Sequence, residues 1–266
     1  QINHAPQIEP QGFTGDEDTP IIGQVIATDV ENDALSYSLV GLPANGTITL
    51  NSATGSFVYT PNGNYNGPDS FVVTVTDDHG NSTTTTIGLT VTPVNDAPVS
   101  SDQNLTTPED TPVAGQVVAT DVEGDTLSYI ISTTATSGTV TLNPATGAFV
   151  YTPSANFNGS DSFVVTVADG NGGFTTSKIN IGVTPVNDAP VSSDQNLTTP
   201  EDTPIPGQVV ATDVDGDTLT YAISSAATNG TVTLNPTTGT FVYTPGANYN
   251  GSDAFVVTIS DGHGGT

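Results

Sequence analysis

A unit of 92 residues repeats along this chain without an insertion or deletion. The string Val-Asn-Asp-Ala-Pro starts at position 94 and again at position 186, and Ile-Asn-His-Ala-Pro at 2–6 is a degenerate earlier copy. Self-similarity at a fixed period decides the architecture of a chain, and this period has the length of a small whole domain. We therefore expect three near-identical domains in tandem, at 1–96, 97–188 and 189–266.

The charge of the chain is almost entirely negative. It has 28 acidic residues against one basic residue, Lys178, and a formal net charge of −27. Such a surface repels nucleic acid and anionic membranes, so we expect neither as a partner. No apolar run is long enough to span a bilayer, which predicts no membrane insertion. The absence of cysteine, with the Thr-, Asn-, Gly- and Asp-rich composition, indicates an exported protein of a bacterial cell surface.

Each repeat has the pattern of an all-β domain. In the second repeat, β-branched and aromatic segments predict strands at 104–107, 112–119, 126–132, 138–142, 148–152, 162–168 and 174–184. Alternation places Phe163, Val165 and Val167 on one face of their strand. No segment has helical periodicity. Seven short strands in a repeat of this length predict an immunoglobulin-like β-sandwich.

An aromatic strand recurs in every repeat. Phe-Val-Tyr-Thr-Pro occupies 57–61, 149–153 and 241–245. We interpret it as a core strand that ends at a proline. An aromatic platform that binds carbohydrate is the alternative interpretation.

The acidic residues recur at fixed loops. The pattern Asp-x-[Asp/Glu]-x-Asp appears once in each repeat, and three carboxylates at alternate positions of a turn can converge on one point. Calcium takes about 6–8 oxygen ligands in a flexible shell, which such a loop supplies. The candidate ligands in this pattern are Asp29, Glu31 and Asp33, then Asp121, Glu123 and Asp125, then Asp213, Asp215 and Asp217.

Further acidic positions recur in phase with these loops. Solvated turn residues are the alternative interpretation, since Asp and Asn favour turns. Recurrence around a linker, in a chain with one cationic side chain, favours Ca²⁺, and the lack of cysteine leaves little for zinc or copper. The additional candidates are Glu17, Asp69, Asp77, Asn95, Asp96, Glu109, Asp161, Asp169, Asn187, Asp188 and Asp261.

The order of these motifs resembles the cadherin-like tandem repeats of large bacterial surface adhesins. Pro-Glu-Asp, Ala-Thr-Asp-Val-Asp-Gly-Asp, an Asp before Phe-Val-Val-Thr, Ala-Asp-Gly-x-Gly-Gly and Val-Asn-Asp-Ala-Pro follow one another in that order. The resemblance covers essentially the whole chain, and it implies calcium at the junctions between domains. It implies Glu17, Asp69, Asn95, Asp96, Asp121, Glu123 and Asp169 at the first junction, and Glu109, Asp161, Asn187, Asp188, Asp213, Asp215 and Asp261 at the second.

The linkers depart from the family pattern beside the Asn-Asp pair. Proline and alanine stand where the family has extra ligands, so we expect one or two ions per junction; these residues are Pro93, Pro185, Ala97 and Ala189. Upstream, His4 replaces the linker aspartate. That replacement predicts a weaker calcium site at the N-terminal edge.

Near-identical repeats, short linkers and acidic clusters together favour a structural role. We expect an elongated array in which calcium and neighbouring repeats stiffen a stalk of a bacterial adhesin or extracellular filament. The third repeat stops at Thr266, ahead of the counterpart of the last strand, so a filament subunit completed by a strand of another copy is an alternative. A glycan- or protein-binding module that uses Tyr65, Phe157 and Tyr249 is another. An enzyme is not expected, because the sequence supports no Ser-His-Asp arrangement.

Overall fold

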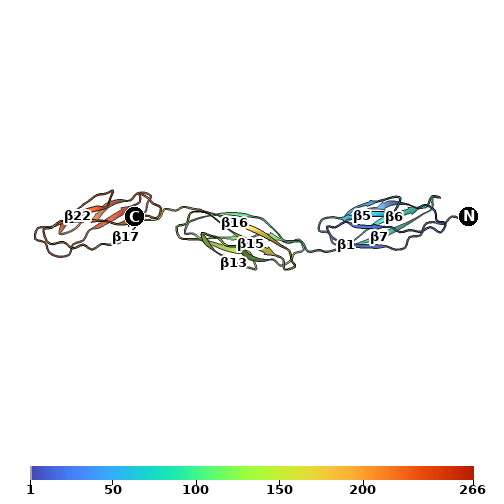
Figure 1. Cartoon of the computed structure of the whole chain (residues 1–266), viewed down its shortest axis with the longest axis horizontal. Helices are drawn as coiled ribbons and strands as arrows, with labels where there is room; N and C mark the ends of the chain where they lie inside the picture. The colour runs from blue at the N-terminus through green and yellow to red at the C-terminus, as the bar shows by residue number, and fades with distance from the viewer. Residues whose placement is uncertain (1) are drawn as a thin grey trace. The chain divides into compact units, whose positions relative to one another are not determined.

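The structure is a computed structural model that describes residues 2–266. The described residues form strands, turns and loops, and they contain no helix that could span a membrane. Sheets recur from repeat to repeat along the chain. Figure 1 labels strands in each of the three repeats. The predicted all-β fold with three tandem immunoglobulin-like domains is confirmed.

The first repeat is a sandwich of two sheets. One has the order β1-β7-β6-β3, formed by Gly12–Asp16, Ser82–Thr92, Gly67–Thr76 and Ser36–Gly41. Within it, β1 runs parallel to β7 and the other pairs are antiparallel. The second sheet has the order β2-β5-β4, formed by Ile21–Gln24, Ser56–Pro61 and Gly46–Leu50.

The second repeat has the same topology. Its sheets are β12-β15-β16-β9, from Ser128–Thr133, Gly159–Ala168, Phe174–Thr184 and Gln103–Pro108, and β10-β14-β13, from Val113–Gln116, Ala148–Pro153 and Gly138–Leu142. A short pair joins β11 to β8, Ala119–Thr120 and Val99–Ser100. The segment predicted as one strand at 112–119 is split, because the amide of Val117 donates to the carbonyl of Gly147 at 2.9 Å between β10 and β11.

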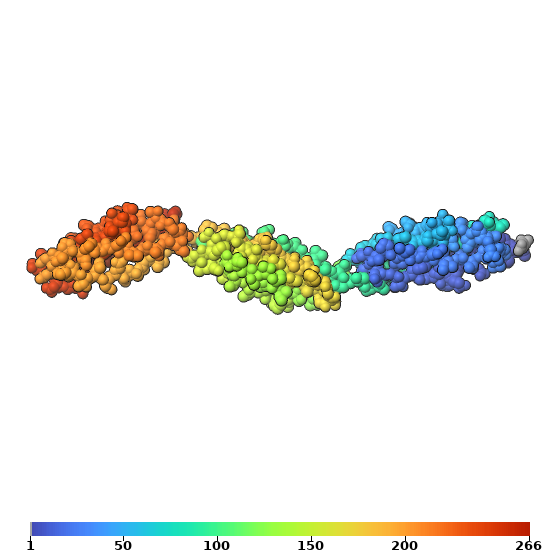
Figure 2. All heavy atoms as spheres, in the orientation of Figure 1, coloured from blue at the N-terminus to red at the C-terminus, as the bar shows by residue number. Residues whose placement is uncertain are grey.

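The third repeat keeps the same small sheet and short pair. These are β18-β22-β21, from Ile205–Gln208, Thr240–Pro245 and Gly230–Leu234, and β17-β19, from Val191–Ser192 and Ala211–Thr212. Among the described residues, β23 (Val256–Ser260) pairs with β20 (Thr220–Ser225) alone. Figure 2 shows the atoms of this repeat, in orange to red, as one packed body.

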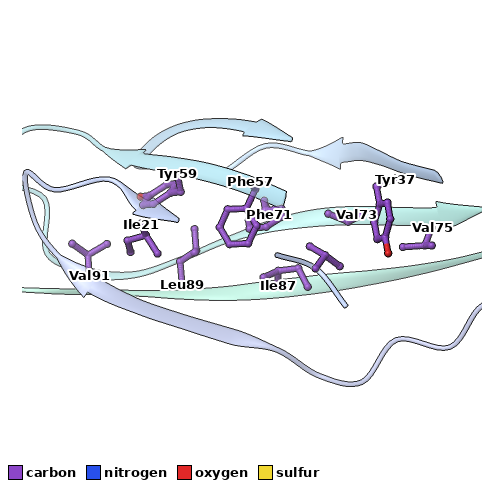
Figure 3. Packing of buried hydrophobic residues seen from close by; sticks show 11 residues of the cluster. Ile21, Tyr37, Phe57, Tyr59, Phe71, Val73, Val75, Ile87, Leu89 and Val91 are labelled. Atoms are coloured by element: carbon purple, nitrogen blue, oxygen red, sulfur yellow. The ribbon is translucent and has the colours of Figure 1, made fainter. Parts of the chain in front are cut away.

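Period-two alternation builds the core of each sandwich. In the first repeat, the rings of Phe57 on β5 and Phe71 on β6 meet at 4.9 Å between centroids. Figure 3 shows these rings beside Ile87 in the space between the strands. Burial of apolar side chains from both sheets is the main favourable contribution to the stability of such a domain.

The alternation predicted for the second repeat is confirmed. Phe163, Val165 and Val167 on β15 are all fully buried. The tyrosines of the Phe-Val-Tyr-Thr-Pro strands, Tyr59 and Tyr151, are fully buried as well. In the first two repeats these strands are therefore core strands, and their tyrosine rings are not available to a carbohydrate.

The described chain divides into two compact units whose boundary does not follow the repeats. The first unit reaches Ser100 and also includes Val118–Ser128 and Val167–Thr175. The second consists of Ser101–Val117, Tyr129–Thr166 and Thr176–Thr266. The acidic loops of the second repeat thus belong to one unit with the first linker. The second linker and the loops on both sides of it belong to the other unit.

Candidate metal centres

Each Asp-x-[Asp/Glu]-x-Asp loop is a turn folded around its first aspartate. Oδ1 of Asp121 accepts hydrogen bonds from the amides of Glu123 and Asp125, both at 3.1 Å. Equivalent bonds form in the first and third repeats. In every loop, one ligand atom from each of the three carboxylates lies within 4.8 Å of the other two. The structure therefore brings the three acidic residues of each loop together.

The second oxygen of the first aspartate has no hydrogen bond. Oδ2 of Asp29, Asp121 and Asp213 is buried and has no partner among residues 2–266. A buried acceptor left unpaired costs about 1–3 kcal/mol, and more when it is charged. Carboxylate oxygens are the ligands that Ca²⁺ prefers. The loops therefore fit a cation that would contact these oxygens.

The linkers are held by the repeat that precedes them. The amide of Val94 donates to Oε1 of Glu17 at 2.7 Å, and Glu17 is only 3% exposed. The amide of Val186 makes the same bond to Glu109 at 2.6 Å. Each buried glutamate thus uses one oxygen to fix the start of a linker.

The linkers are also held by the repeat that follows them. Nδ2 of Asn95 donates to Oδ2 of Asp169 at 2.8 Å, while Oδ1 of Asp169 accepts three amides of its own turn. The asparagine bond contributes most to lowering the pKa of Asp169, and the amides add to it against the effect of burial. Equivalent bonds of 2.8 Å join Asn187 to Asp261 and Asn3 to Asp77.

Carboxylates from both sides crowd around the second linker aspartate. The amide of Asp188 donates to Oδ2 of Asp215 at 2.8 Å, whereas Oδ2 of Asp188 is buried without a partner among residues 2–266. Burial raises the pKa of Asp188, and repulsion raises it further, from Asp215, Asp110, Glu109 and Asp213. Two of these four residues precede the linker and two follow it. A shared cation would relieve this repulsion.

The first linker shows similar crowding. The amide of Asp96 donates to Oε2 of Glu123 at 3.4 Å. Burial raises the pKa of Glu123, and repulsion from Asp96 and Asp121 raises it further. Together these effects outweigh the hydrogen bonds that lower this pKa. The carboxylate of Asp96 is partly satisfied, because Nδ2 of Asn64 donates to its Oδ2 at 2.8 Å.

Two predicted ligands are used by the sandwich itself. The oxygens of Asp161 accept five hydrogen bonds, from the amides of Thr136, Ser137 and Ser162 and the hydroxyls of Thr136 and Tyr151. Burial opposes ionisation of Asp161, but these bonds outweigh it and lower its pKa. Asp69 accepts four bonds, from the amides of Ala44, Asn45 and Ser70 and the hydroxyl of Tyr59. No metal-ligand group among residues 2–266 includes either carboxylate, so their role toward calcium stays a prediction.

The candidates from the sequence did not include Asn64, whose amide is bonded to Asp18 of the Glu-Asp pair. Both have left-handed backbone, with φ of 55° and 58°. Oδ1 of Asp18 accepts the amide of Asn64 at 3.0 Å, which presents the Asn64 side chain to the linker aspartate. The signal in the sequence was an asparagine that recurs at 64, 156 and 248.

The exposed-loop aromatics proposed for ligand binding are tied to their own loops. The hydroxyl of Tyr65 donates to the carbonyl of Pro68 at 2.6 Å, and that of Tyr249 to Ser252 at 2.7 Å. Tyr65 also packs against the core of its repeat. Packing accounts for the position of Tyr65 without a ligand.

Comparison with known proteins places this fold in a family. Protocadherin Fat 4 of Homo sapiens is 28% identical over 242 residues, which cover 80% of this chain and only 5% of that protein. A structure of mouse cadherin-23 EC22-24 superposes with a TM-score of 0.58 at 20% identity, over 98% of this chain and 94% of that one. A structure of human CDH23 EC21-23 superposes with a TM-score of 0.56 at 19% identity, over 96% of this chain and 99% of that one.

The similarity to these cadherin structures is one of fold. The model of a family described as bacterial Ig domain matches residues 3–90, 95–182 and 187–266, one match in each repeat. Together, the matches confirm the resemblance to cadherin-like repeats with an immunoglobulin-like fold. The chain belongs to the bacterial Ig domain family, of which it carries three tandem copies.

Proposed function

We propose that this chain is a calcium-stiffened extender of an extracellular bacterial protein, such as a cell-surface adhesin or filament. The observation that carries the proposal is the crowding of carboxylates from both neighbouring repeats around a linker aspartate, Asp188, whose Oδ2 is buried and unpaired within residues 2–266. The chain has one basic residue, so its own cations cannot neutralise both linkers. An oxygen-only set of ligands suits Ca²⁺.

The proposed mechanism is electrostatic. Without a cation, close carboxylates repel each other by roughly 1 kcal/mol per pair even in a water-like dielectric. A divalent ion reverses the sign of this interaction and connects the loops before and after the linker. Glu17 and Asn95 fix the linker backbone so that the aspartate lies against the next acidic loop. The proposed ligands are Asp96, Asp121 and Glu123 at the first linker, and Asp188, Asp213 and Asp215 at the second.

A spacer role follows from the repetition. Three copies of one domain are joined by short linkers that contain proline, and the freedom that remains in each linker is what a bound ion would remove. Bacterial Ig domain membership supports a bacterial setting, and the match to a protocadherin supports a structural or adhesive role outside the cell. The chain corresponds to a small part of that relative, so the target of the whole protein is left to experiment.

Small-angle scattering with calcium and with chelator tests the proposal. We expect calcium to convert a flexible ensemble into a stiffer one, reversibly. The matched control is the double variant Asp96→Asn, Asp188→Asn, which keeps the linker length and the backbone hydrogen bonds but removes one carboxylate at each linker. This variant should respond much less to calcium. Identical profiles of the original chain in calcium and in chelator would refute the calcium-stiffened extender.

A further inference from the structure

Two of the three histidines lie against the acidic loop of the first repeat. Nδ1 of His4 is 2.6 Å from Oε1 of Glu31. Nδ1 of His79 is 3.1 Å from Oδ2 of Asp33 and 2.8 Å from Oδ1 of Asp78. The loop thus has imidazole nitrogens on two of its three carboxylates.

The first repeat acquires these groups by departing from the second repeat. At three of the positions that differ, His4, Asp78 and His79 stand where the second repeat has Asp96, Gly170 and Asn171. In the second repeat, Nδ2 of Asn171 donates to Oδ2 of Asp125 at 2.7 Å, so an amide occupies the place of the imidazole. Three independent departures therefore act on one loop, and two of them introduce nitrogen ligands.

Imidazole changes the metal that such a cluster prefers. Carboxylate, carbonyl and water ligands suit calcium, whereas imidazole with carboxylate suits zinc and its first-row neighbours. Ligand atoms of Asp33, Asp78 and His79 lie within 4.8 Å of one another. Ligand atoms that each lie about 2.0–2.1 Å from a tetrahedral zinc ion are about 3.3 Å from one another. The distances from Nδ1 of His79 to the carboxylate oxygens of Asp33 and Asp78 are close to this value. In addition, the buried Oδ2 of Asp29 in the same loop has no hydrogen bond within residues 2–266.

We propose that Asp33, Asp78 and His79 form a site for a transition-metal dication, of which Zn²⁺ is the representative, with His4 beside it on Glu31. The site goes beyond the proposed function, because it takes a different metal and lies upstream of both linkers. Three protein ligands leave one position of a tetrahedral ion for water or for a side chain from elsewhere. Calcium at the linkers and zinc at this loop can therefore coexist.

Calorimetric titration of the tag-free chain with Zn²⁺, in a large excess of Ca²⁺, tests the site. We expect one zinc ion to bind more tightly than any other. His79→Asn and Asp78→Gly each import the residue of the second repeat, so both variants should fold, and each should weaken this binding by about tenfold or more, as even outer-shell partners are worth about 10–100-fold. His4→Asp should weaken it less.

His263→Asn is the matched control. Nδ1 of His263 lies 3.0 Å from Asp217, but a glycine, Gly262, stands at the position of Asp78, so this variant should keep the tight site. Zinc should also shift the imidazole ¹⁵N resonances of His79. Equal zinc affinity in the original chain and in His79→Asn, or full displacement of zinc by calcium, would overturn the assignment. Calcium is present throughout the zinc titration, so this titration tests the zinc site alone. If the zinc site were refuted, the scattering test of calcium at the linkers would be unaffected.

Discussion

The first aspartate of each acidic loop uses its two oxygens differently. Oδ1 of Asp121 shapes the turn by accepting two amides, whereas Oδ2 is buried without a partner among the described residues. The first oxygen therefore serves the local backbone, and the second is available to an ion. A substitution that keeps an oxygen acceptor in the place of Oδ1 but removes the negative charge of the carboxylate separates the two roles.

We predict that Asp121→Asn leaves stability in calcium-free buffer unchanged or slightly raised, because the amide oxygen still accepts the turn amides and one negative charge is gone. In calcium, the variant should lose most of the ligand's stabilisation of this site, about 2.7 kcal/mol at a hundredfold excess over Kd. Urea unfolding followed by tyrosine fluorescence measures both, since the chain has no tryptophan. Asp194→Asn, at an exposed position outside the acidic loops, is the control. An unchanged calcium response of Asp121→Asn would contradict the ligand role.

At the scale of elements, strand β10 is built to accept an aromatic ring. Gly115 pairs with Phe149 of β14, and a Cβ at Gly115 would overlap that ring. Phe149 in turn packs edge-on against Phe163 of β15, at 5.1 Å between centroids. The glycine therefore lets the ring of one sheet reach the other sheet.

We predict that Gly115→Ala destabilises the second repeat by about 1–3 kcal/mol, the usual cost of an overpacked core. Adding Phe149→Leu should recover part of this loss by vacating the space. Thermal unfolding of the three proteins measures the effect. Gly182→Ala, whose new Cβ would have Thr106 Oγ1 at an ordinary 3.8 Å, should change stability little. A neutral Gly115→Ala would show that the ring moves at no cost.

At the scale of the whole molecule, a net charge of −27 opposes compactness unless cations compensate. The carboxylates with a raised pKa, Glu123 and Asp188, and those with a lowered one, such as Asp161 and Asp169, respond to pH in opposite directions. A group whose pKa is raised in the folded state stabilises the fold at pH values below its unfolded pKa, and this stabilisation is lost as pH rises through the folded pKa. A group whose pKa is lowered in the folded state stabilises the fold at pH values above its unfolded pKa, and this stabilisation is lost as pH falls through the folded pKa.

We predict that the calcium-free chain gains stability as pH falls from neutrality through the raised pKa values of Glu123 and Asp188, which then take up protons. It loses stability below about 4, the unfolded pKa of aspartate, as pH falls toward the lowered pKa values of Asp161 and Asp169. With calcium bound, the gain should vanish, because the ion keeps the linker carboxylates ionised. Melting temperature against pH, in metal-depleted and in calcium buffer, measures this. Parallel curves in the two buffers would speak against carboxylate crowding at the linkers.

The sequence by itself determined the features that local periodicity controls. The repeat, the strands and the buried face of Phe163, Val165 and Val167 follow from period-two alternation, which a strand expresses wherever it lies. The convergence of Asp121, Glu123 and Asp125 follows in the same way, because the turn that brings them together spans five residues and closes on its own aspartate. The boundaries of the domains and the identity of the ion stay predictions.

Only the tertiary structure decided how each carboxylate is used. Asp161 is joined to Thr136 across 25 positions of sequence, and Glu109 to Val186 across 77. Sequence patterns list both as acidic residues in phase, yet one has all its oxygens bonded by the sandwich and the other fixes a linker. Hydrogen-bond partners that distant are selected by how the sheets pack, so only the folded chain shows which oxygens are left free for a cation.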